Sequence, residues 1–343
     1  MAKLGETNEI MKFGIVGCGL IGRKRAASIG NKKENRLVAA ADLEVKKSEA
    51  LCAEFGGRAM TSAADVINSE AEIIVISTTH DQLASLTLTA VRAGKHVLLE
   101  KPGARNAKEL EPIAIEAAKR NLKIKVGFNH RFHPAIWQAK KLVNQGEIGQ
   151  LMFVRGRYGH GGRINYEKEW RFNREISGGG ELLDQGSHLI DLARWFLGEF
   201  ATVGGILPRC YWSGNVEDNC FLTMQTVDGK VAHLHASWTE WKNTFCFEIY
   251  GKSGKLQIDG LGGSYGLEQL SFYKMSPQMG PPQTTIWQYP FPDTSWDLEM
   301  EELVTAISEN RSPVGDVNDA LSNLRLVDEL YQLERKNKHD YRS

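Results

Sequence analysis

The feature that most constrains this chain is the glycine-rich turn Gly17–Gly22, which stands between a short apolar run and a helical stretch. The apolar run Lys12–Val16 predicts a buried strand, and Ile21–Ile29 predicts a helix that begins as the turn ends. A strand that passes through glycines directly into a helix is the context in which a GxGxxG sequence binds a dinucleotide.

Each position of this turn has a physical role. Gly17 would permit the tight turn, Gly19 would let a pyrophosphate approach the backbone, and Gly22 would let the helix pack closely on the strand. The helix N-terminus, with the backbone N–H groups of Leu20 and Ile21, would face the phosphates. We therefore predict that these five residues bind a dinucleotide cofactor.

An acidic residue, Asp42, ends the second predicted strand about 20 residues beyond Gly22. A carboxylate here accepts hydrogen bonds from the adenosine ribose and repels a 2′-phosphate, which favours NAD over NADP. Lys46 and Lys47 lie a turn further on and could weaken that preference. The alternative interpretation, a plain glycine turn with a surface aspartate, is disfavoured because strand, spacing, helix and acid occur together.

The rest of residues 1–128 alternates apolar runs with helical stretches. Strands are predicted at 37–42, 73–77, 96–99 and 123–128, and helices at 46–55, 82–93 and 107–121. This alternation predicts βαβ units and an α/β fold, a doubly wound parallel sheet of the Rossmann type.

Residues 129–343 follow a different pattern, which predicts an α+β domain with an open, largely antiparallel sheet. Strands are predicted at 220–227, 231–238, 244–250 and 255–258, and helices at 180–197, 297–309 and 318–335. The segment Gly262–Asp293 is rich in Gly, Pro and Ser and predicts a loop.

Composition excludes several function classes. Lys plus Arg and Asp plus Glu both total 42, so no net positive charge supports nucleic-acid binding. The polar first ten residues predict no secretory signal, and no apolar run reaches the roughly 18 residues of a membrane span. The five cysteines are scattered, so we expect no disulfide framework, no metal site and a cytoplasmic setting.

Two further motifs follow the glycine turn. Ala93–Pro102 reads AGKHVLLEKP, and Trp170-Arg171 precedes Gly178–Asp191, which reads GGGELLDQGSHLID. Over essentially the whole chain these motifs resemble the glucose-fructose oxidoreductase/inositol dehydrogenase family. The resemblance implies a Rossmann domain, a second domain that binds a small sugar or polyol, and a homodimer or homotetramer formed through the open sheet.

Three residues of these motifs are suited to oxidising a secondary alcohol. Asp184 and His188 lie four residues apart and would share one face of a helix. A histidine oriented by a carboxylate can take the hydroxyl proton, and the Lys101 ammonium can stabilise the developing alkoxide. Taken singly, His188 could be an ordinary helix histidine bonded to Asp184, and Lys101 a surface lysine. The resemblance implies that all three are catalytic.

Other motif residues are candidates for holding the cofactor: Thr78, His80, Glu100, Lys101 and Arg171. The family commonly has Thr-Pro-Asn-x-x-His after the fourth strand, whereas this chain has Thr78–Leu83, TTHDQL, without the Pro and the later His. His80 could replace the missing contacts or cap the following helix.

Substrate clues lie mainly in the predicted loop Tyr158–Tyr166. Its aromatic and polar groups could bind a polyhydroxylated ring, while Arg163 and Arg171 could instead clamp a phosphate or carboxylate. An ordered surface loop or subunit contact is the alternative. Arg131 is a further candidate for reaching cofactor or substrate, ahead of its neighbours His130 and His133.

Together these patterns predict an NAD-dependent oxidoreductase acting on a secondary alcohol of a sugar, cyclitol or sugar derivative, nucleotide-linked sugars included. One alternative is an NAD-using glycosidase-like hydrolase of the same family, which would oxidise its substrate only transiently. The other is a non-catalytic NAD-binding sensor, against which the joint presence of Lys101, Asp184 and His188 argues.

Overall fold

The computed structural model describes residues 10–278 and 280–340, so most of the N-terminal segment in which no secretory signal is expected lies outside it. The chain divides into two compact units. Unit 1 comprises Met1–Ala104, Lys108–Gly127 and Trp296–Asn318, and unit 2 comprises Arg105–Ala107, Phe128–Ser295 and Asp319–Ser343. The sequence prediction assigns Trp296–Asn318 to the second domain, whereas its contacts place it in unit 1.

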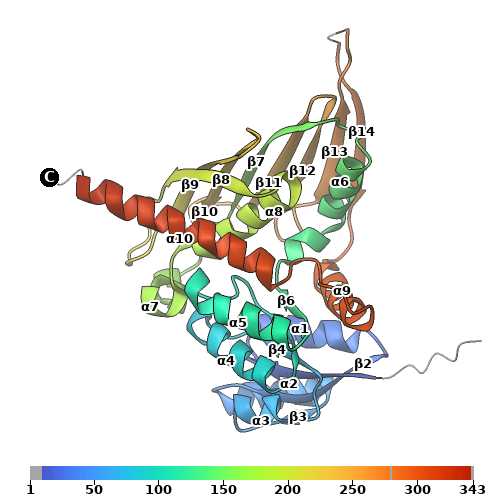
Figure 1. The fold of residues 1–343 in the computed structure, drawn as a ribbon, viewed down its shortest axis with the longest axis vertical. Helices are drawn as coiled ribbons and strands as arrows, with labels where there is room; N and C mark the ends of the chain where they lie inside the picture. The colour runs from blue at the N-terminus through green and yellow to red at the C-terminus, as the bar shows by residue number, and fades with distance from the viewer. Residues whose placement is uncertain (1–9, 279, 341–343) are drawn as a thin grey trace, which may run out of the picture. The chain divides into compact units, whose positions relative to one another are not determined.

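Unit 1 is built on a parallel sheet of six strands in the order β3-β2-β1-β4-β5-β6 (Figure 1). The strands are β1 (Met11–Val16), β2 (Asn35–Ala41), β3 (Arg58–Ala59), β4 (Ile73–Ile76), β5 (His96–Leu99) and β6 (Ile124–Val126). Every residue of β4 is buried, as expected for a parallel strand with helices on both faces. The order reverses between β1 and β4, the switch point where doubly wound sheets bind nucleotides. The predicted Rossmann fold is confirmed.

The helices of unit 1 connect these strands and cover the sheet. They are α1 (Leu20–Gly30), α2 (Val45–Phe55), α3 (Ala63–Ile67), α4 (His80–Arg92), α5 (Ala107–Lys119) and α9 (Ser295–Ser308). Helix α1 packs against β1, β2 and β4, and α4 packs against β4 and β5. The N-termini of α1 and α4 therefore follow the two strands that flank the switch point.

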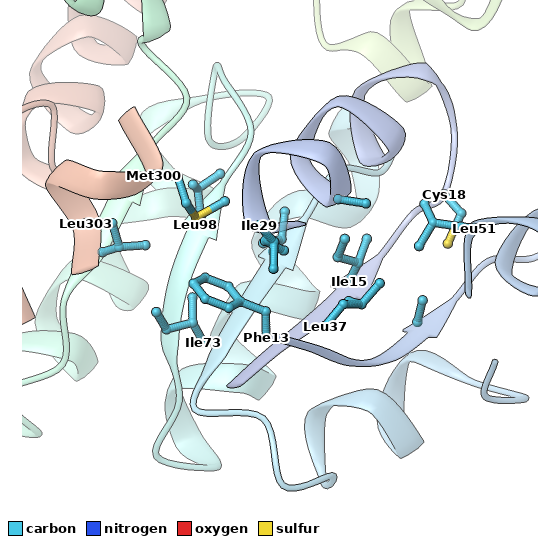
Figure 2. Packing of buried hydrophobic residues seen from close by; sticks show 13 residues of the cluster. Phe13, Ile15, Cys18, Ile29, Leu37, Leu51, Ile73, Leu98, Met300 and Leu303 are labelled. Atoms are coloured by element: carbon cyan, nitrogen blue, oxygen red, sulfur yellow. The ribbon is translucent and has the colours of Figure 1, made fainter. Parts of the chain in front are cut away.

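The core of unit 1 joins residues that are far apart in the sequence. Phe13, Ile15 and Leu98 from the central strands are fully buried, and Met300 and Leu303 of α9 pack into the same cluster (Figure 2). A helix from near the end of the chain therefore completes the core of the N-terminal sheet.

Unit 2 is built on a sheet of eight strands in the order β14-β13-β12-β11-β7-β10-β9-β8. All neighbouring strands are antiparallel except β7 and β10, which are parallel. The strands are β7 (Leu151–Gly159), β8 (Phe200–Ile206), β9 (Asn219–Thr226), β10 (Val231–Ser237), β11 (Thr244–Gly251), β12 (Gly254–Asp259), β13 (Glu268–Lys274) and β14 (Gln283–Tyr289). The predicted α/β architecture with a second, largely antiparallel sheet is confirmed.

One face of this sheet carries helices. Helix α8 packs against β7 and β10, and α6 packs against β12, β13 and β14 (Figure 1). The helical elements of unit 2 are η1 (Asn129–Phe132), α6 (Pro134–Asn144), η2 (Tyr166–Lys168), η3 (Trp170–Phe172), α7 (Arg174–Ser177), η4 (Leu182–Gly186), α8 (Ser187–Leu197) and α10 (Val317–Asp340). Along β9, buried and exposed side chains alternate, which leaves the other face of the sheet open within the chain.

The predicted loop Gly262–Asp293 is wrong over much of its length, because it contains the strand β13 and the edge strand β14. Its Gly, Pro and Ser residues concentrate in the connections. Glu268–Lys274 is largely buried, whereas Gln283–Tyr289 is mostly exposed and joins the sheet through its pairing with β13. None of the helices among the described residues is both long and apolar enough to cross a membrane.

Candidate functional site

The glycine turn has the geometry that a dinucleotide needs. Gly17 has φ +95°, and a Cβ there would lie 2.5 Å from the carbonyl oxygen of Ser77. A Cβ on Gly22 would lie 2.1 Å from the carbonyl oxygen of Gly17. A Cβ on Gly19, in contrast, would meet nothing within 4 Å. The protein's own packing therefore requires Gly17 and Gly22, whereas the space beside Gly19 is open to a pyrophosphate.

The N-terminus of α1 fits the same interpretation. Gly19 is its N-cap residue and supplies no side-chain hydrogen bond, so the first-turn N–H groups of Leu20 and Ile21 receive no cap from it. Leu20 is 74% exposed. An uncapped N-terminus at the end of β1 offers N–H donors and the positive end of the helix dipole to an anion.

Asp42 is held beside this turn by two backbone groups. Its Oδ2 accepts a 2.7 Å hydrogen bond from the N–H of Cys18, and its Oδ1 accepts one of 2.9 Å from the N–H of Glu44. The Lys47 ammonium donates to Glu44 at 2.6 Å, which draws that lysine toward a different carboxylate. The carboxylate predicted to read the ribose is thus fixed at the carboxyl end of β2.

Thr78 and His80 follow β4, at the neighbouring strand end. Thr78 Oγ1 donates to the carbonyl of Thr79 at 3.3 Å, and the His80 side chain is 5% exposed at the start of α4. A residue that the sequence did not single out, Ser77, ties the two strand ends together because its Oγ donates to the carbonyl of Gly17 at 2.7 Å. No local sequence signal distinguishes this serine.

Glu100 and Lys101 follow β5, and the peptide bond from Lys101 to Pro102 is cis. Lys101 is partly exposed, whereas Glu100 is buried and accepts a 2.7 Å hydrogen bond from Nε of Arg25. Burial raises the pKa of Glu100 although the Arg25 cation opposes that rise. The structure thus places Glu100, predicted to hold the cofactor, in an ion pair with α1.

Arg25 also binds Glu299 of α9, at 2.6 Å, and the ammonium of Lys125 lies 3.3 Å from the other oxygen of that carboxylate. The side chains of Arg25, Glu299 and Lys125 are all 0% exposed. We call these three residues and Glu100 the buried charge network. Its member Glu100 directly precedes Lys101 in the chain. The network links the end of β5 to β6, α1 and α9.

In unit 2, Asp184 and His188 do not lie on one continuous α-helix. Asp184 is on the π-helical turn η4, and His188 is the second residue of α8. Such π-helical turns occur often at functional sites. The predicted helix over 180–197 is therefore present from residue 181 onward, but residues 182–186 form a π-helical turn and regular α-helix begins only at Ser187.

The glycines before this turn are required by tight packing. A Cβ on Gly179 would lie 1.9 Å from Oη of Tyr331, and a Cβ on Gly180 would lie 2.0 Å from the carbonyl oxygen of Glu217. The Glu217 carboxylate accepts hydrogen bonds from Tyr331 Oη at 2.6 Å and from the N–H of Gly180 at 3.0 Å. The chain that carries Asp184 is thus fixed against β9 and α10.

The structure brings two predicted residues into contact: Nε of Arg171 donates to Oδ2 of Asp184 at 3.2 Å. Arg171 also binds Glu169, which pairs with the 62% exposed Arg163. Tyr166, another substrate candidate, is 1% exposed inside a cluster of aromatic rings. Arg163 on the predicted loop and Arg171 beyond it therefore remain accessible, and Tyr166 supports the loop from within.

The His188 side chain is 5% exposed, and its ring lies flat on that of His130, with centroids 3.8 Å apart and planes 14° apart. Arg131, the neighbour of His130, makes two hydrogen bonds to Asp191 of α8, at 2.8 and 2.6 Å. Arg131, predicted to reach cofactor or substrate, is engaged in this ion pair instead. His130, which ranked below it, is the residue that contacts a predicted catalytic group.

The strand order, the glycine turn and the anchored acid of unit 1 define a Rossmann-type dinucleotide-binding protein. Residues 11–128 match an oxidoreductase family with an NAD-binding Rossmann fold, and residues 136–257 match the GFO/IDH/MocA C-terminal domain. The chain belongs to the GFO/IDH/MocA family of NAD-binding oxidoreductases, which confirms the resemblance seen in its motifs.

Several known relatives span nearly the whole chain. Inositol 2-dehydrogenase of Rhizobium meliloti is 26% identical over 330 residues, which cover 93% of this chain and 95% of the relative. Inositol 2-dehydrogenase of Salmonella typhimurium is 29% identical over 315 residues, which cover 89% and 88%. A levoglucosan dehydrogenase solved with NADH and levoglucosan superimposes with a TM-score of 0.86 at 22% identity, covering 95% of this chain and 97% of that one. This last similarity shows the shared fold.

Proposed function

We propose that the chain catalyses hydride transfer between NAD and a secondary alcohol of a cyclic polyol, sugar or sugar derivative, nucleotide-linked sugars included. The observation that carries the proposal is the open glycine turn beside the anchored Asp42, in a family whose relatives of matching length are named for cyclic polyols. The relative with similar fold was solved with an anhydrosugar, which agrees with this substrate class.

When bound, the nicotinamide would supply the hydride acceptor. For holding the cofactor we propose Gly17, Gly19, Leu20, Ile21, Gly22, Asp42, Thr78, His80, Lys101 and Arg171. Glu100 would contribute indirectly, because its carboxylate pairs with Arg25 and fixes the position from which Lys101 extends. Asp42 would bind the ribose hydroxyls and disfavour a 2′-phosphate, so NAD is preferred over NADP.

For the chemistry we propose Lys101 of unit 1 and Asp184 and His188 of unit 2. The imidazole of His188 would take the hydroxyl proton, and the Lys101 ammonium would stabilise the alkoxide as it forms. Asp184 would orient the reacting groups. The hydrogen bond from Arg171 supports this role, because it fixes the orientation of the Asp184 carboxylate.

The substrate test is a panel of inositols, anhydrosugars, monosaccharides and nucleotide-linked sugars, each offered with NAD and with NADP. We expect NADH absorbance to grow with at least one cyclic polyol or sugar, and more slowly with NADP. Release of free sugar from a glycoside without net NADH would instead support the NAD-using hydrolase. NAD binding without turnover on any member would support the sensor.

The role test compares His188→Ala with His233→Ala, a control at an exposed position on the open face of β10 whose mass is checked by light scattering. Loss of a general base typically costs about 10²–10⁴-fold in rate. We expect a loss of that size in His188→Ala and none in His233→Ala, with NAD affinity unchanged in both. Full activity in His188→Ala would refute the assignment of the base.

We further propose that the chain forms a homodimer or homotetramer through the open face of the eight-stranded sheet. The exposed side chains of β9 include Phe221, which is 42% exposed and stacks on His235 of β10. Its cross-strand partner Ile206 of β8 is 69% exposed, and two adjacent apolar side chains on an open sheet face support a contact with a second copy. Phe221→Asp should reduce the mass measured by light scattering to that of the monomer.

A further inference from the structure

His130 forms part of the surroundings of the proposed base, although its place in the sequence makes it only a weaker site candidate than Arg131. It lies on the turn η1, and its side chain is 4% exposed. Its ring covers the face of His188 at a centroid distance of 3.8 Å and an interplanar angle of 14°. Two imidazoles are thus stacked in parallel inside unit 2.

Aromatic edges on several sides hold the His130 ring. The ring of Tyr158 on β7 meets it edge-on, with ring centroids 5.0 Å apart. The rings of His133 and Phe245 also meet it edge-on, each with a centroid distance of 5.8 Å. His133 is itself fixed by a 2.9 Å contact with the carboxylate of Glu268 on β13. The ring of His130 therefore has a defined plane that neighbouring strands impose.

An ion pair fixes the turn η1 relative to α8. Arg131 binds Asp191 through two hydrogen bonds, and Asp191 lies three residues after His188 on the same helix. Two consecutive residues of η1 therefore contact two residues of α8 that are about one turn apart. This double attachment sets the register in which His130 meets His188.

We propose that His130 is a positioning residue for His188: it holds the plane of the base, and its neutral ring face stabilises the imidazolium that forms when His188 takes a proton. This inference rests on the proposed role of His188. A flat neighbour prevents rotation of the ring, so the base keeps its direction toward the reacting hydroxyl. A cation stacked on a neutral π face is favourable, whereas two cations at this distance repel each other, so the pair holds one proton at a time.

The titratable groups around the pair are Tyr158, His133 with Glu268, Asp184 on η4 and Glu181 directly before η4. Burial raises the pKa of Tyr158 well above its ordinary value, so this phenol stays neutral while the pair titrates. The carboxylates of Asp184 and Glu181 favour one positive charge near the pair. These carboxylates do not remove the repulsion that two stacked imidazolium rings would exert on each other.

The kinetic test uses two substitutions of the same residue. His130→Phe keeps a flat ring against His188, whereas His130→Leu removes it. We expect kcat to fall on the order of 10²-fold in His130→Leu, with KM within about 3-fold, and His130→Phe to recover most of the loss. His233→Leu, on the open sheet face, is the control for loss of a histidine outside the stack, with light scattering to show that its mass is that of the wild type. Thermal melting and NAD affinity would show that the variants fold.

A second readout needs neither cofactor nor substrate. In protein labelled with ¹⁵N-histidine, His130 and His188 should titrate as a coupled pair with two steps at least about one pH unit apart. In His130→Phe, His188 should titrate in a single step. Independent titration of the two wild-type rings would overturn the proposed coupling.

The outcomes separate this inference from the function on which it rests. If His188→Ala is inactive while His130→Leu keeps wild-type kcat, His130 has no positioning role and the proposed function stands. If His188→Ala keeps its activity, the proposed base is wrong, whatever the His130 variants do. Equal losses in His130→Leu and His130→Phe would also overturn the stacking role.

Discussion

Replacing Arg25 with methionine tests whether the buried charge network holds unit 1 together. The Arg25 guanidinium is 0% exposed and binds two carboxylates, those of Glu100 and Glu299. Lys125 would still neutralise Glu299, at 3.3 Å, so Glu100 is the charge that would be left without its partner. Removing one member of a buried ion pair costs about 3–5 kcal/mol. We therefore expect Arg25→Met to lose about 4 kcal/mol of unfolding free energy.

The loss should depend on pH in a defined direction. Burial already raises the pKa of Glu100, and without the Arg25 cation it would rise further. When the pKa of an acid is raised by folding, the folded protein is most stable below the pKa of that acid in the unfolded chain. The protein loses this stability as pH rises through the folded-state pKa. The deficit of Arg25→Met should therefore be large near about pH 8 and shrink toward about pH 5.

The assay is urea unfolding followed by tryptophan fluorescence, since the Trp296 ring lies 4.5 Å from the Arg25 guanidinium. The double variant Arg25→Met/Glu100→Met removes a matched pair of charges and leaves Lys125 with Glu299. It should recover at least half of the loss. A deficit below about 1 kcal/mol, or one equal at both pH values, would show that the network is not the source of stability.

Three further predictions concern the cofactor turn and a loop of unit 2. Gly19→Ala should keep wild-type thermal stability and lose at least about 10-fold in NAD affinity. Gly22→Ala should lower the melting temperature, because its Cβ would overlap the Gly17 carbonyl. Equal melting temperatures of the two variants would contradict this. Asp42→Asn should reduce the preference for NAD over NADP by about 10-fold, measured as the ratio of kcat/KM values. Burial alone would raise the pKa of Asp218, but hydrogen bonds from the N–H groups of residues 210–212 lower it. Asp218→Ala should therefore cost about 3 kcal/mol at neutral pH. Urea titrations should show this difference fading as pH falls below about 4, where the unfolded carboxylate binds a proton, and disappearing below the lower pKa of the folded carboxylate.

The sequence contained enough to predict the cofactor turn. Gly17, Gly22 and Asp42 act through local geometry, since a positive φ, a close helix–strand contact and a strand-end carboxylate all follow from short-range spacing. The central parallel strands could also be predicted, because a strand buried on both faces appears in the sequence as an uninterrupted run of apolar residues.

Long-range pairing set the limits of prediction. Glu100 and Arg131 were chosen as site candidates from local motifs, yet their partners lie 75 and 60 residues away, and nothing near them in the sequence marks an ion pair. The edge strand Gln283–Tyr289 is polar and mostly exposed, so only its pairing with β13 identifies it as a strand. The stack of His130 on His188 likewise depends on how η1 meets α8.

The contribution of α9 to unit 1 has a consequence for how the protein is made. Met300 and Leu303 fill the same core as Phe13 and Leu98, and Glu299 is the partner of Arg25. During synthesis the N-terminal sheet therefore remains without part of its core until nearly the whole chain has left the ribosome, and N-terminal-first folding, the usual order for separate domains, is incomplete here. A fragment ending near residue 128 should bind hydrophobic dyes and aggregate, whereas supplying the missing helix as a peptide should restore its compactness.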